Sequence, residues 1–357
     1  MNGEGAHVVK QARPTAPLMA SNGWSGGRDA AREPVQDNAT QSSDNLAPMT
    51  LFHENWWLAA VTKGRFEEAV VKNGSQVIGR LPFVIEKKIG FTTVRLPPFT
   101  HVLGPVVDAG VGKPQTQLVR RLSIVRNLID QLPPFDFLKH AFGSSLPDGL
   151  AFQDRGFQVS PQYTFEIDCR ADPRDLWDAM HFKTRQHIRR AEEKFSVAAV
   201  NDPNEFVGFY LRNLAARGLV CRLPLESFPT VFSACEARDS GEILSANWPD
   251  GKPAAMVFIV WGHGMMYYLL STRAKDDSDN GSVSLLIWSA IQRAHDRGVK
   301  FDLDGVTTSG IARFLSGFGG RLEARTIVRR STRAFATMQY AKRKLIGSKG
   351  EDTLWFS

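Results

Sequence analysis

The sequence predicts an α+β fold in which one structural unit occurs twice in tandem. A hairpin, a further strand, a helix and a strand that contains a Phe-Asp pair follow one another over residues 67–142 and again over residues 241–306. The chain has 357 residues and 43% of them are hydrophobic, enough for two cores of ordinary size. We therefore expect two domains, over residues 49–170 and 171–346.

The first unit opens with a short helix over Thr50–Val61, in which Trp56 and Trp57 are apolar anchors. Asn73-Gly74 predicts a hairpin turn, and a second turn is expected at residues 88–90. A helical pattern then covers residues 115–131, and the stretch FDFLKHAF predicts the closing strand.

The second unit repeats this order. Asp250-Gly251 predicts its hairpin turn, and Gly262–Gly264 a second turn. Apolar residues at helical spacing predict a helix over Ser284–Gly298, and VKFDLDG predicts the strand after it. Asp172-Pro173 opens a helical stretch between the two units, which continues to Lys194.

Both ends of the chain differ from the middle. Residues 1–48 lack an apolar run and are rich in Gly, Ala, Ser, Asn and Pro, which predicts a disordered arm, and residues 347–357 are expected to form a tail. No stretch has the apolar length of a membrane-spanning helix, and the start does not resemble a signal peptide. The three scattered cysteines favour a reducing compartment and lack metal-ligand spacing, so we expect a cytoplasmic protein without a metal.

The formal net charge is +7, and basic residues concentrate in residues 183–194 and 321–349. A positive surface suits an anionic partner such as a phosphate, a nucleotide, RNA or a lipid headgroup. A solvated helix face with internal ion pairs explains either cluster equally well.

The order of elements resembles the GNAT acyltransferase fold, and two copies in tandem resemble its FemAB-like branch. The stretches FHENWWLAAV, IGRLPFVI and PPFTHVLGPVV are similar to the first domain of FemAB-like acetyltransferases associated with bacterial surface polysaccharide. FKTRQHIRRAEE and the closing segment IARFLSGFGG are similar to parts of the second domain. The resemblance covers residues 50–330 and rests on the order of these motifs.

The resemblance implies transfer of an acyl group from acyl-CoA or aminoacyl-tRNA to an amine, without a metal. The chain departs from the family pattern in two places. The stretch STRAKDDSDNGSVS stands where ordinary GNAT enzymes have a Gln/Arg-x-x-Gly-x-Gly/Ala phosphate loop. Leu315 stands where family members often carry Lys. These departures leave the nature of the acyl donor and the contacts to substrate phosphate open.

Two groups of residues are candidates for binding anions. Asn280, Gly281, Ser282 and Ser284 surround a predicted helix N-terminus, whose free N–H groups could hold a phosphate with the help of Arg273. Ordinary helix capping is the alternative. In the basic helix, Arg185 and Arg189 lie along one stripe, while Lys183 belongs to a neighbouring one, and these three are expected to bind substrate. His101 is also expected to bind substrate, and His101 and His263 are further candidates for the general base.

The strand FDLDG carries the candidate catalytic residues. Alternation places Asp302 and Asp304 on one face, from which either could accept the proton of the attacking ammonium group. The neighbouring strand places Tyr267 and Tyr268 on opposite faces, and one of them, with Tyr268 preferred, could protonate the leaving thiolate. Asp136 repeats Asp302 in the first unit, whereas Leu138 stands in the position of Asp304, so we expect Asp302 to be architectural and Asp304 functional.

The function expected from these observations is N-acyltransfer from acyl-CoA to an amine of a sugar or cell-envelope precursor. An aminoacyl-tRNA-dependent transferase is the second reading. The third is a non-catalytic protein that binds RNA or a membrane surface through the basic stretch 329–345. We expect a small anionic substrate, with tRNA or a peripheral membrane contact as alternatives, and no DNA. The oligomeric state is left open.

Overall fold

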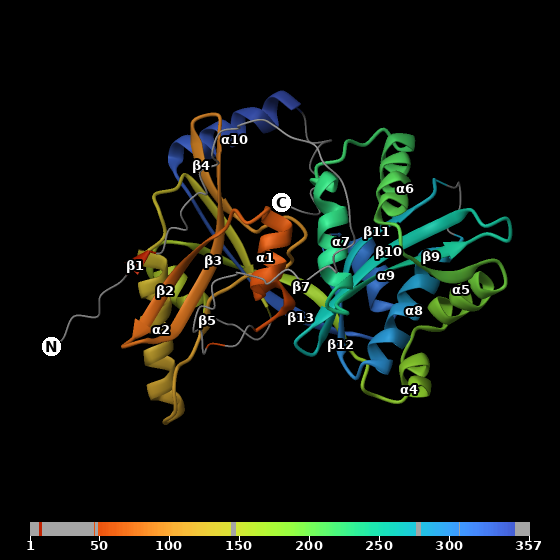
Figure 1. Ribbon diagram of the computed structural model, residues 1–357, viewed down its shortest axis with the longest axis horizontal. Coiled ribbons are helices and arrows are strands. Elements are labelled where there is room, and N and C mark those ends of the chain that lie inside the picture. The colour runs from red at the N-terminus through yellow and green to blue at the C-terminus, as the bar shows by residue number, and fades with distance from the viewer. Residues whose placement is uncertain are drawn as a thin grey trace, which may run out of the picture.

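The computed structural model describes residues 7–8, 46, 49–143, 148–275, 280–306 and 308–346, and it forms two α+β lobes joined by central strands (Figure 1). The tail predicted for residues 347–357 and most of the predicted arm lie outside the described residues. A two-residue strand of the arm, β1 (His7–Val8), pairs with β2 (Glu67–Asn73). An unpaired strand edge offers N–H and C=O groups to any extended segment, which accounts for this pairing.

The N-terminal lobe has the predicted order of elements. Gly74 and Gly90 take the positive φ values, 61° and 76°, that the two predicted turns require. The predicted first helix is a short 3₁₀ turn followed by α1. The elements, in chain order, are the 3₁₀ turn Leu51–His53, α1 (Asn55–Thr62), β2, β3 (Gln76–Lys88), β4 (Phe91–Arg95), β5 (Val106–Val107), α2 (Pro114–Asp130), β6 (Phe137–Phe142), α3 (Gly149–Asp154) and β7 (Gln158–Asp168).

The second half also follows the prediction, including the turns at Gly251 and Gly264. The helical stretch between the units divides into two short helices. The elements are α4 (Pro173–Asp178), α5 (Phe182–Glu192), β8 (Ser196–Val200), α6 (Pro203–Ala216), the 3₁₀ turn Leu225–Ser227, α7 (Phe228–Glu236), β9 (Gly241–Asn247), β10 (Pro253–Gly262), β11 (Met265–Arg273), α8 (Ser282–Asp296), β12 (Lys300–Val306), α9 (Ser309–Ser316), β13 (Arg321–Ser331) and α10 (Arg333–Ile346).

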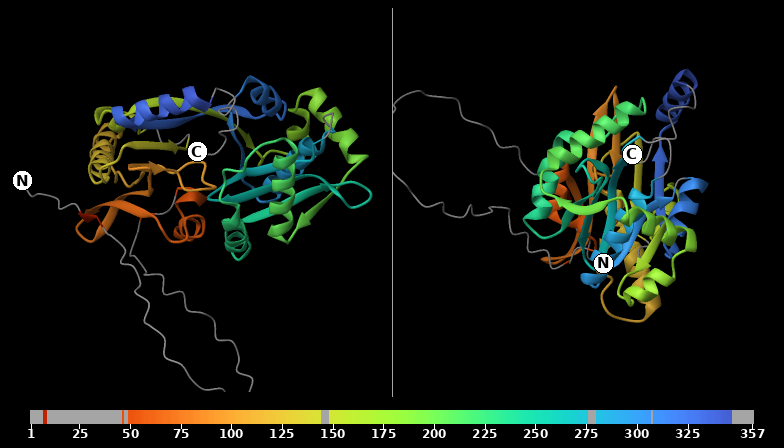
Figure 2. Two further views of the ribbon diagram at one scale, coloured as in Figure 1. Left: turned by 90° about the horizontal axis from the view of Figure 1, so that it is seen from above. Right: turned by 90° about the vertical axis from the view of Figure 1, so that its right-hand side faces the viewer.

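The two halves exchange strands at the centre of the molecule. Among the described residues the sheet has the order β1-β2-β3-β4-β6-β13-β7-β12-β11-β10-β9-β8, with β5 on the side of β3. The last strand, β13, therefore lies beside β6 of the first half, while β7 lies beside β12 of the second. From above, the two lobes meet along these strands, and α10 runs along the N-terminal lobe (Figure 2).

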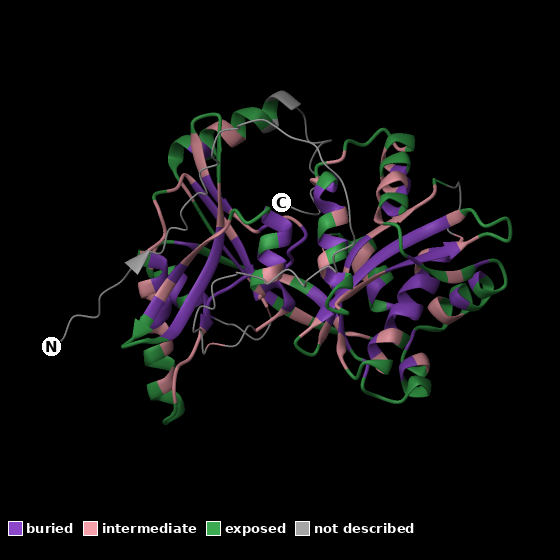
Figure 3. Ribbon diagram, in the orientation of Figure 1, coloured by how far each residue is buried: buried purple, intermediate pink, exposed green. Residues whose placement is uncertain are grey.

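Three hydrophobic cores fill the layers between the helices and the sheet. One lies under α2 and α3 in the N-terminal lobe, and one under α5 and α8 in the C-terminal lobe. The third joins the lobes, because α1, α6 and α7 pack there against β10, β11 and the loop that contains Phe99. Buried residues accordingly follow the strands through both lobes (Figure 3). No helix in the described part of the chain has the length and apolar character needed to cross a membrane.

Candidate functional site

The strands β11 and β12 run side by side for three residues and then part. Their parallel pairing ends with Tyr267 opposite Asp302. The register between β12 and β7 shifts between Asp302 and Gly305, and Asp304 at this bulge has a φ of 70°. Beyond Tyr267 the two strands diverge, which opens a gap in the sheet.

A cavity of about 480 Å³ lies at this gap. Tyr268 and Leu269 are consecutive in β11 and point to opposite faces of the sheet, yet both line the cavity. The cavity therefore extends to both faces. The lining residues come from α6 and the loop after it, from β11, from the start of α8, from β12 and from α9: Tyr210, Leu214, Arg217, Leu219, Val220, Cys221, Arg222, Leu223, Tyr268, Leu269, Ser271, Thr272, Arg273, Val283, Leu303, Asp304, Gly305, Ile311, Phe314 and Leu315.

Asp304 connects this cavity with a buried polar cluster. Its Oδ1 atom lies 3.1 Å from Nη1 of Arg325 and 3.2 Å from Nδ1 of His101, while 17% of the side chain remains exposed. A left-handed φ is unfavourable for a residue with a Cβ atom and persists where the surroundings impose it. The contacts and the bulge together aim one carboxylate at the cavity.

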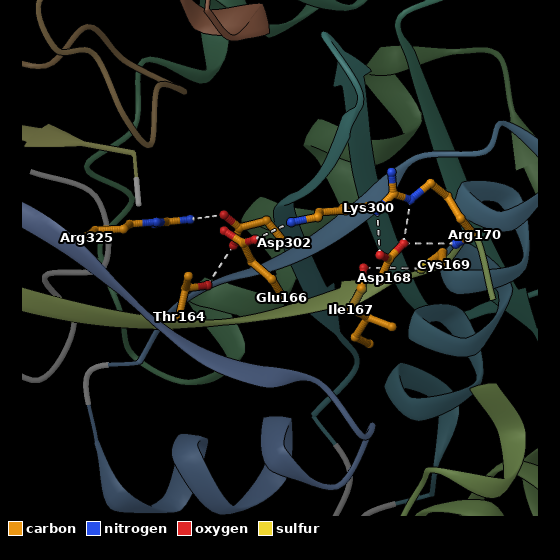
Figure 4. A network of polar contacts seen from close by, with 9 residues as sticks. All are labelled: Thr164, Glu166, Ile167, Asp168, Cys169, Arg170, Lys300, Asp302 and Arg325. Carbon is orange, nitrogen blue, oxygen red and sulfur yellow. Dashed lines mark hydrogen bonds and ion pairs between the residues drawn. The ribbon is translucent and has the colours of Figure 1, made fainter. Parts of the chain in front are cut away.

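Asp302 has a different environment, and it is absent from the cavity lining in the described structure. Its carboxylate accepts hydrogen bonds from Nη2 of Arg325 at 2.6 Å, from the Thr164 hydroxyl at 2.6 Å and from the Asp304 backbone N–H at 2.9 Å. Figure 4 shows Arg325 and Thr164 converging on it. Burial opposes its charge, but the guanidinium of Arg325 and the hydrogen bonds outweigh burial and hold the pKa of Asp302 below its ordinary value.

Arg325 joins both carboxylates and is almost completely buried on β13. Burial lowers the pKa of this guanidinium, yet Asp302 and Asp304 together raise it above the ordinary value. Neither Arg325 nor Thr164 was among the site residues predicted from the sequence. Two carboxylates on one buried face require a cation, and an Arg at an inward position of an apolar strand is the signal that could have located it.

His101 lies behind Asp304 and away from water. Its ring packs against Phe52, with centroids 5.7 Å apart, and against Tyr267 at 6.5 Å. Burial lowers the pKa of His101, although the charge of Asp304 acts in the opposite direction. The imidazole is therefore neutral at neutral pH, which suits a positioning contact to Asp304.

The two neighbouring tyrosines have separate environments. Tyr267 is buried against Phe52, with ring centroids 4.6 Å apart. Tyr268 lines the cavity together with Asp304. Burial raises the pKa of Tyr268 to about 12, against a smaller effect of a hydrogen bond with Ser271. Its phenol therefore keeps its proton at neutral pH.

The residues predicted to bind the donor are divided between two environments. Arg273 lines the cavity, and its Nη1 atom is buried without a hydrogen-bond partner among the described residues. The side chain of Asn280 caps α8 by accepting the Ser282 N–H at 3.1 Å. A Cβ atom on Gly281 would lie 2.9 Å from the His187 carbonyl oxygen, so α5 packs directly against this helix start.

Ser282 and Ser284 are buried in the first turn of α8. The Ser282 hydroxyl oxygen, like Nη1 of Arg273, is buried without a partner in the described structure. Among the described residues of this first turn, Val283 lines the cavity, whereas Ser282 and Ser284 do not.

The basic helix α5 does not contribute to the Asp304 cavity. Arg185 and Arg189 line a separate cavity of about 420 Å³ beside α4. Arg185 pairs with Asp178 at 3.1 Å, and Arg189 lies over the Trp177 ring at 5.4 Å. Lys183 lies 5.9 Å from the ring centre of Phe182 on the surface.

The chain is similar to known proteins in one domain and in its overall fold. Residues 153–308, which contain Tyr268, Arg273 and Asp304, match the family model of the acetyltransferase (GNAT) domain. The crystal structure of FemX is similar to this chain at a TM-score of 0.57 and 12% identity, over 80% of this chain and 92% of FemX. No curated protein sequence matches the chain.

A second solved structure is the C-terminal domain of a protein described as a lysylphosphatidylglycerol synthetase from Agrobacterium fabrum. It has a TM-score of 0.53 and 14% identity, over 83% of this chain and 93% of that domain. At these identities the likeness concerns the fold. Residues 153–308 therefore form a GNAT-type domain, which supports an enzyme of the acyltransferase type, and the expected likeness to FemAB-like proteins is confirmed at the level of the fold.

Proposed function

We propose that the protein is an N-acyltransferase that moves an acyl group from acyl-CoA to an amine of a sugar or cell-envelope precursor. One observation carries this proposal: Asp304 and Tyr268 line the same cavity, at the point where β11 and β12 part. A proton acceptor and a proton donor that share one cavity can serve the two proton transfers of acyl transfer to an amine.

The reaction forms a C–N bond and breaks the C–S bond of the thioester. Asp304 accepts the proton that the ammonium group loses before it attacks, directly or through a water molecule. Tyr268 donates its phenolic proton to the departing sulfur, and the second proton, which the nitrogen releases as the amide forms, restores the phenol. Arg325 and His101 are positioning residues, because both contact Oδ1 of Asp304.

Acyl-CoA supplies an activated carbonyl group, and the cavity residues fit part of such a donor. The walls are largely apolar side chains such as Leu214, Leu269 and Phe314, which suit an acyl chain and exclude water. The unpartnered Nη1 atom of Arg273 would bind an anionic group of the donor. Because α5 covers the first turn of α8, we assign the anion contact to Arg273 in preference to the hydroxyls of Ser282 and Ser284.

The covered start of α8 also supports a second candidate, transfer from aminoacyl-tRNA. A donor that does not place a pyrophosphate on this helix would not need the space that α5 occupies. The proton transfers at Asp304 are the same, but the bond that breaks is the C–O bond of the aminoacyl ester.

The test is a donor and acceptor panel with product detection by mass spectrometry. The full chain is incubated with acetyl-CoA, longer acyl-CoAs and charged tRNA, each with amino sugars and their nucleotide derivatives. We expect product from one donor class with an amine acceptor, and loss of it in Asp304→Asn but not in Asp296→Asn, an exposed control. Absence of product, together with no donor that raises the melting temperature, would refute the proposal.

A further inference from the structure

Three basic side chains lie side by side across β4, β6 and β13 in the N-terminal lobe. Arg95 is the Cα partner of Lys139 in the parallel β4–β6 pair, and Lys139 is the partner of Arg329 in the antiparallel β6–β13 pair. Side chains at such partner positions point to one face of a sheet and start roughly 5 Å apart. The three cations therefore form one row.

An aromatic ring holds the two arginines of this row together. Phe137 precedes Lys139 by two residues and lies on the same face of β6. The guanidinium carbons of Arg95 and Arg329 lie 5.1 Å and 5.4 Å from its ring centroid. Phe137 is in turn stacked on Phe335 of α10, with centroids 5.0 Å apart. Both guanidinium groups are thus fixed over one small area.

The neighbouring charges of the row repel one another. Like charges at directly opposite positions destabilise a sheet. Burial, followed by the charges of Arg329 and Arg95, lowers the pKa of Lys139. Within the described residues neither Arg95 nor Arg329 forms an ion pair with a carboxylate, and Nε of Arg95 is buried without a hydrogen-bond partner.

We propose that the row of Arg95, Lys139 and Arg329 binds a phosphoryl or diphosphate group. A guanidinium fork matches two phosphate oxygens, and a lysine adds a point charge beside it. Such a ligand would relieve the repulsion within the row. Arg329 lies four residues from Arg325 along β13, roughly 13 Å at the usual rise of a strand, so this site is separate from the Asp304 cavity. The proposal does not depend on the transfer chemistry.

The experiment is calorimetric titration of the full chain with inorganic pyrophosphate at low salt. Arg329→Gln is compared with Arg330→Gln, a matched control on the same strand. Arg330 points to the opposite face, where it lies 4.5 Å from the ring centres of Phe135 and Phe157. We expect Arg329→Gln to weaken binding at least tenfold and Arg330→Gln to change it less than twofold. No binding by the unaltered chain, or equal weakening by the two variants, would overturn the proposal.

Melting temperature provides a second readout that separates binding from folding. Without ligand, Arg329→Gln should melt no lower than the unaltered chain, because the substitution removes a repulsion. Pyrophosphate should raise the melting temperature of the unaltered chain and of Arg330→Gln, but not that of Arg329→Gln. A rise of the same size in all three proteins would place the anion elsewhere.

Vesicles distinguish the two sources of the phosphoryl group. A site for a lipid headgroup predicts cosedimentation with phosphatidylglycerol vesicles, weaker in Arg329→Gln and reversed by pyrophosphate, and none with phosphatidylcholine vesicles. A site for a free phosphorylated molecule predicts pyrophosphate binding without cosedimentation. Either result supports the row as a phosphoryl site, and failure of both overturns it.

Discussion

Asp302 and Asp304 are two residues apart on β12 and share one arginine, yet their surroundings give them different chemistry. Asp302 is enclosed by Arg325, Thr164 and the backbone of the bulge, and among the described residues it is not part of the cavity lining. Asp304 shares Arg325 and His101 on one oxygen and lines the cavity. At this scale the bulge, with its positive φ, separates the carboxylate that is enclosed by Arg325 and Thr164 from the carboxylate that lines the cavity.

The first residue-scale prediction concerns Asp302. Asp302→Asn leaves Arg325 buried with one carboxylate, and loss of a partner from a buried ion pair typically costs about 3 kcal/mol. We expect the free energy of unfolding in urea to fall by about that amount, whereas the exposed control Asp296→Asn should change it by less than about 0.5 kcal/mol. Equal stability of the two variants would show that Arg325 does not need Asp302.

A second residue-scale prediction concerns Tyr268 as the proton donor. Tyr268→Phe removes the hydroxyl and keeps the ring, so the rate with an alkyl thioester donor should fall on the order of a hundredfold. A nitrothiophenyl thioester leaves without protonation, and with this donor the loss should nearly disappear. The ratio of the two losses, measured by thiol release, is the readout. The same loss with both donors would assign Tyr268 a role in packing.

At the scale of elements, the sequence predicted the components better than their pairing. Turn residues such as Asn73-Gly74 and Asp250-Gly251 determine hairpins locally, and these hairpins were confirmed. The exchange of β7 and β13 between the halves was not predicted. An apolar strand is compatible with several neighbours, and its periodicity does not say which neighbour it joins. Arg325 was missed for this reason, because only the exchange brings β13 to the carboxylates of β12.

The candidate site was likewise predicted in part. The doubled Phe-Asp pattern pointed to Asp304, and the structure brings Asp304, Tyr268 and Arg273 to one cavity. Charge patterning on α5 could not show that Arg185 is occupied by Asp178 and lies at another cavity. Asp136, the repeat of Asp302, accepts hydrogen bonds from the Thr92 N–H at 2.9 Å and the Thr332 hydroxyl at 3.2 Å. The repeated aspartates thus both tie neighbouring strands together, with different partners.

At the scale of the whole molecule, buried histidines should make stability depend on pH. Burial lowers the pKa of His53 and of His140 from 6.5 to about 4, against hydrogen bonds to Gly104 and Leu103. The unfolded chain therefore binds more protons than the folded one between these values. The contribution of these histidines to the free energy of unfolding is fully present above about pH 6.5. It is lost as the pH drops towards about 4, and the loss is about 3 kcal/mol for each histidine.

Urea unfolding across this range checks the prediction. In His140→Gln the free energy of unfolding should fall less steeply between about pH 6.5 and about pH 4. The slope should be smaller by the contribution of one proton, about 1.4 kcal/mol per pH unit. A side-chain amide can donate to the Leu103 carbonyl as the imidazole does, so the stability at pH 7 should change less than the slope. An unchanged slope would show that His140 does not titrate on unfolding in this window.

The two lobes join around a gap in the sheet, and Asp304 lies at this gap. The central claim is that Asp304 accepts the proton of the acceptor amine. The most direct measurement is the rate of acyl transfer by Asp304→Asn and by Asp296→Asn, at pH 7 and pH 9, with saturating donor. At pH 7 we expect Asp304→Asn to be slower on the order of a hundredfold, with unchanged donor affinity. At pH 9 the free amine is abundant and the deficit should shrink. Full activity of Asp304→Asn at pH 7, or a deficit that does not change with pH, would contradict the claim.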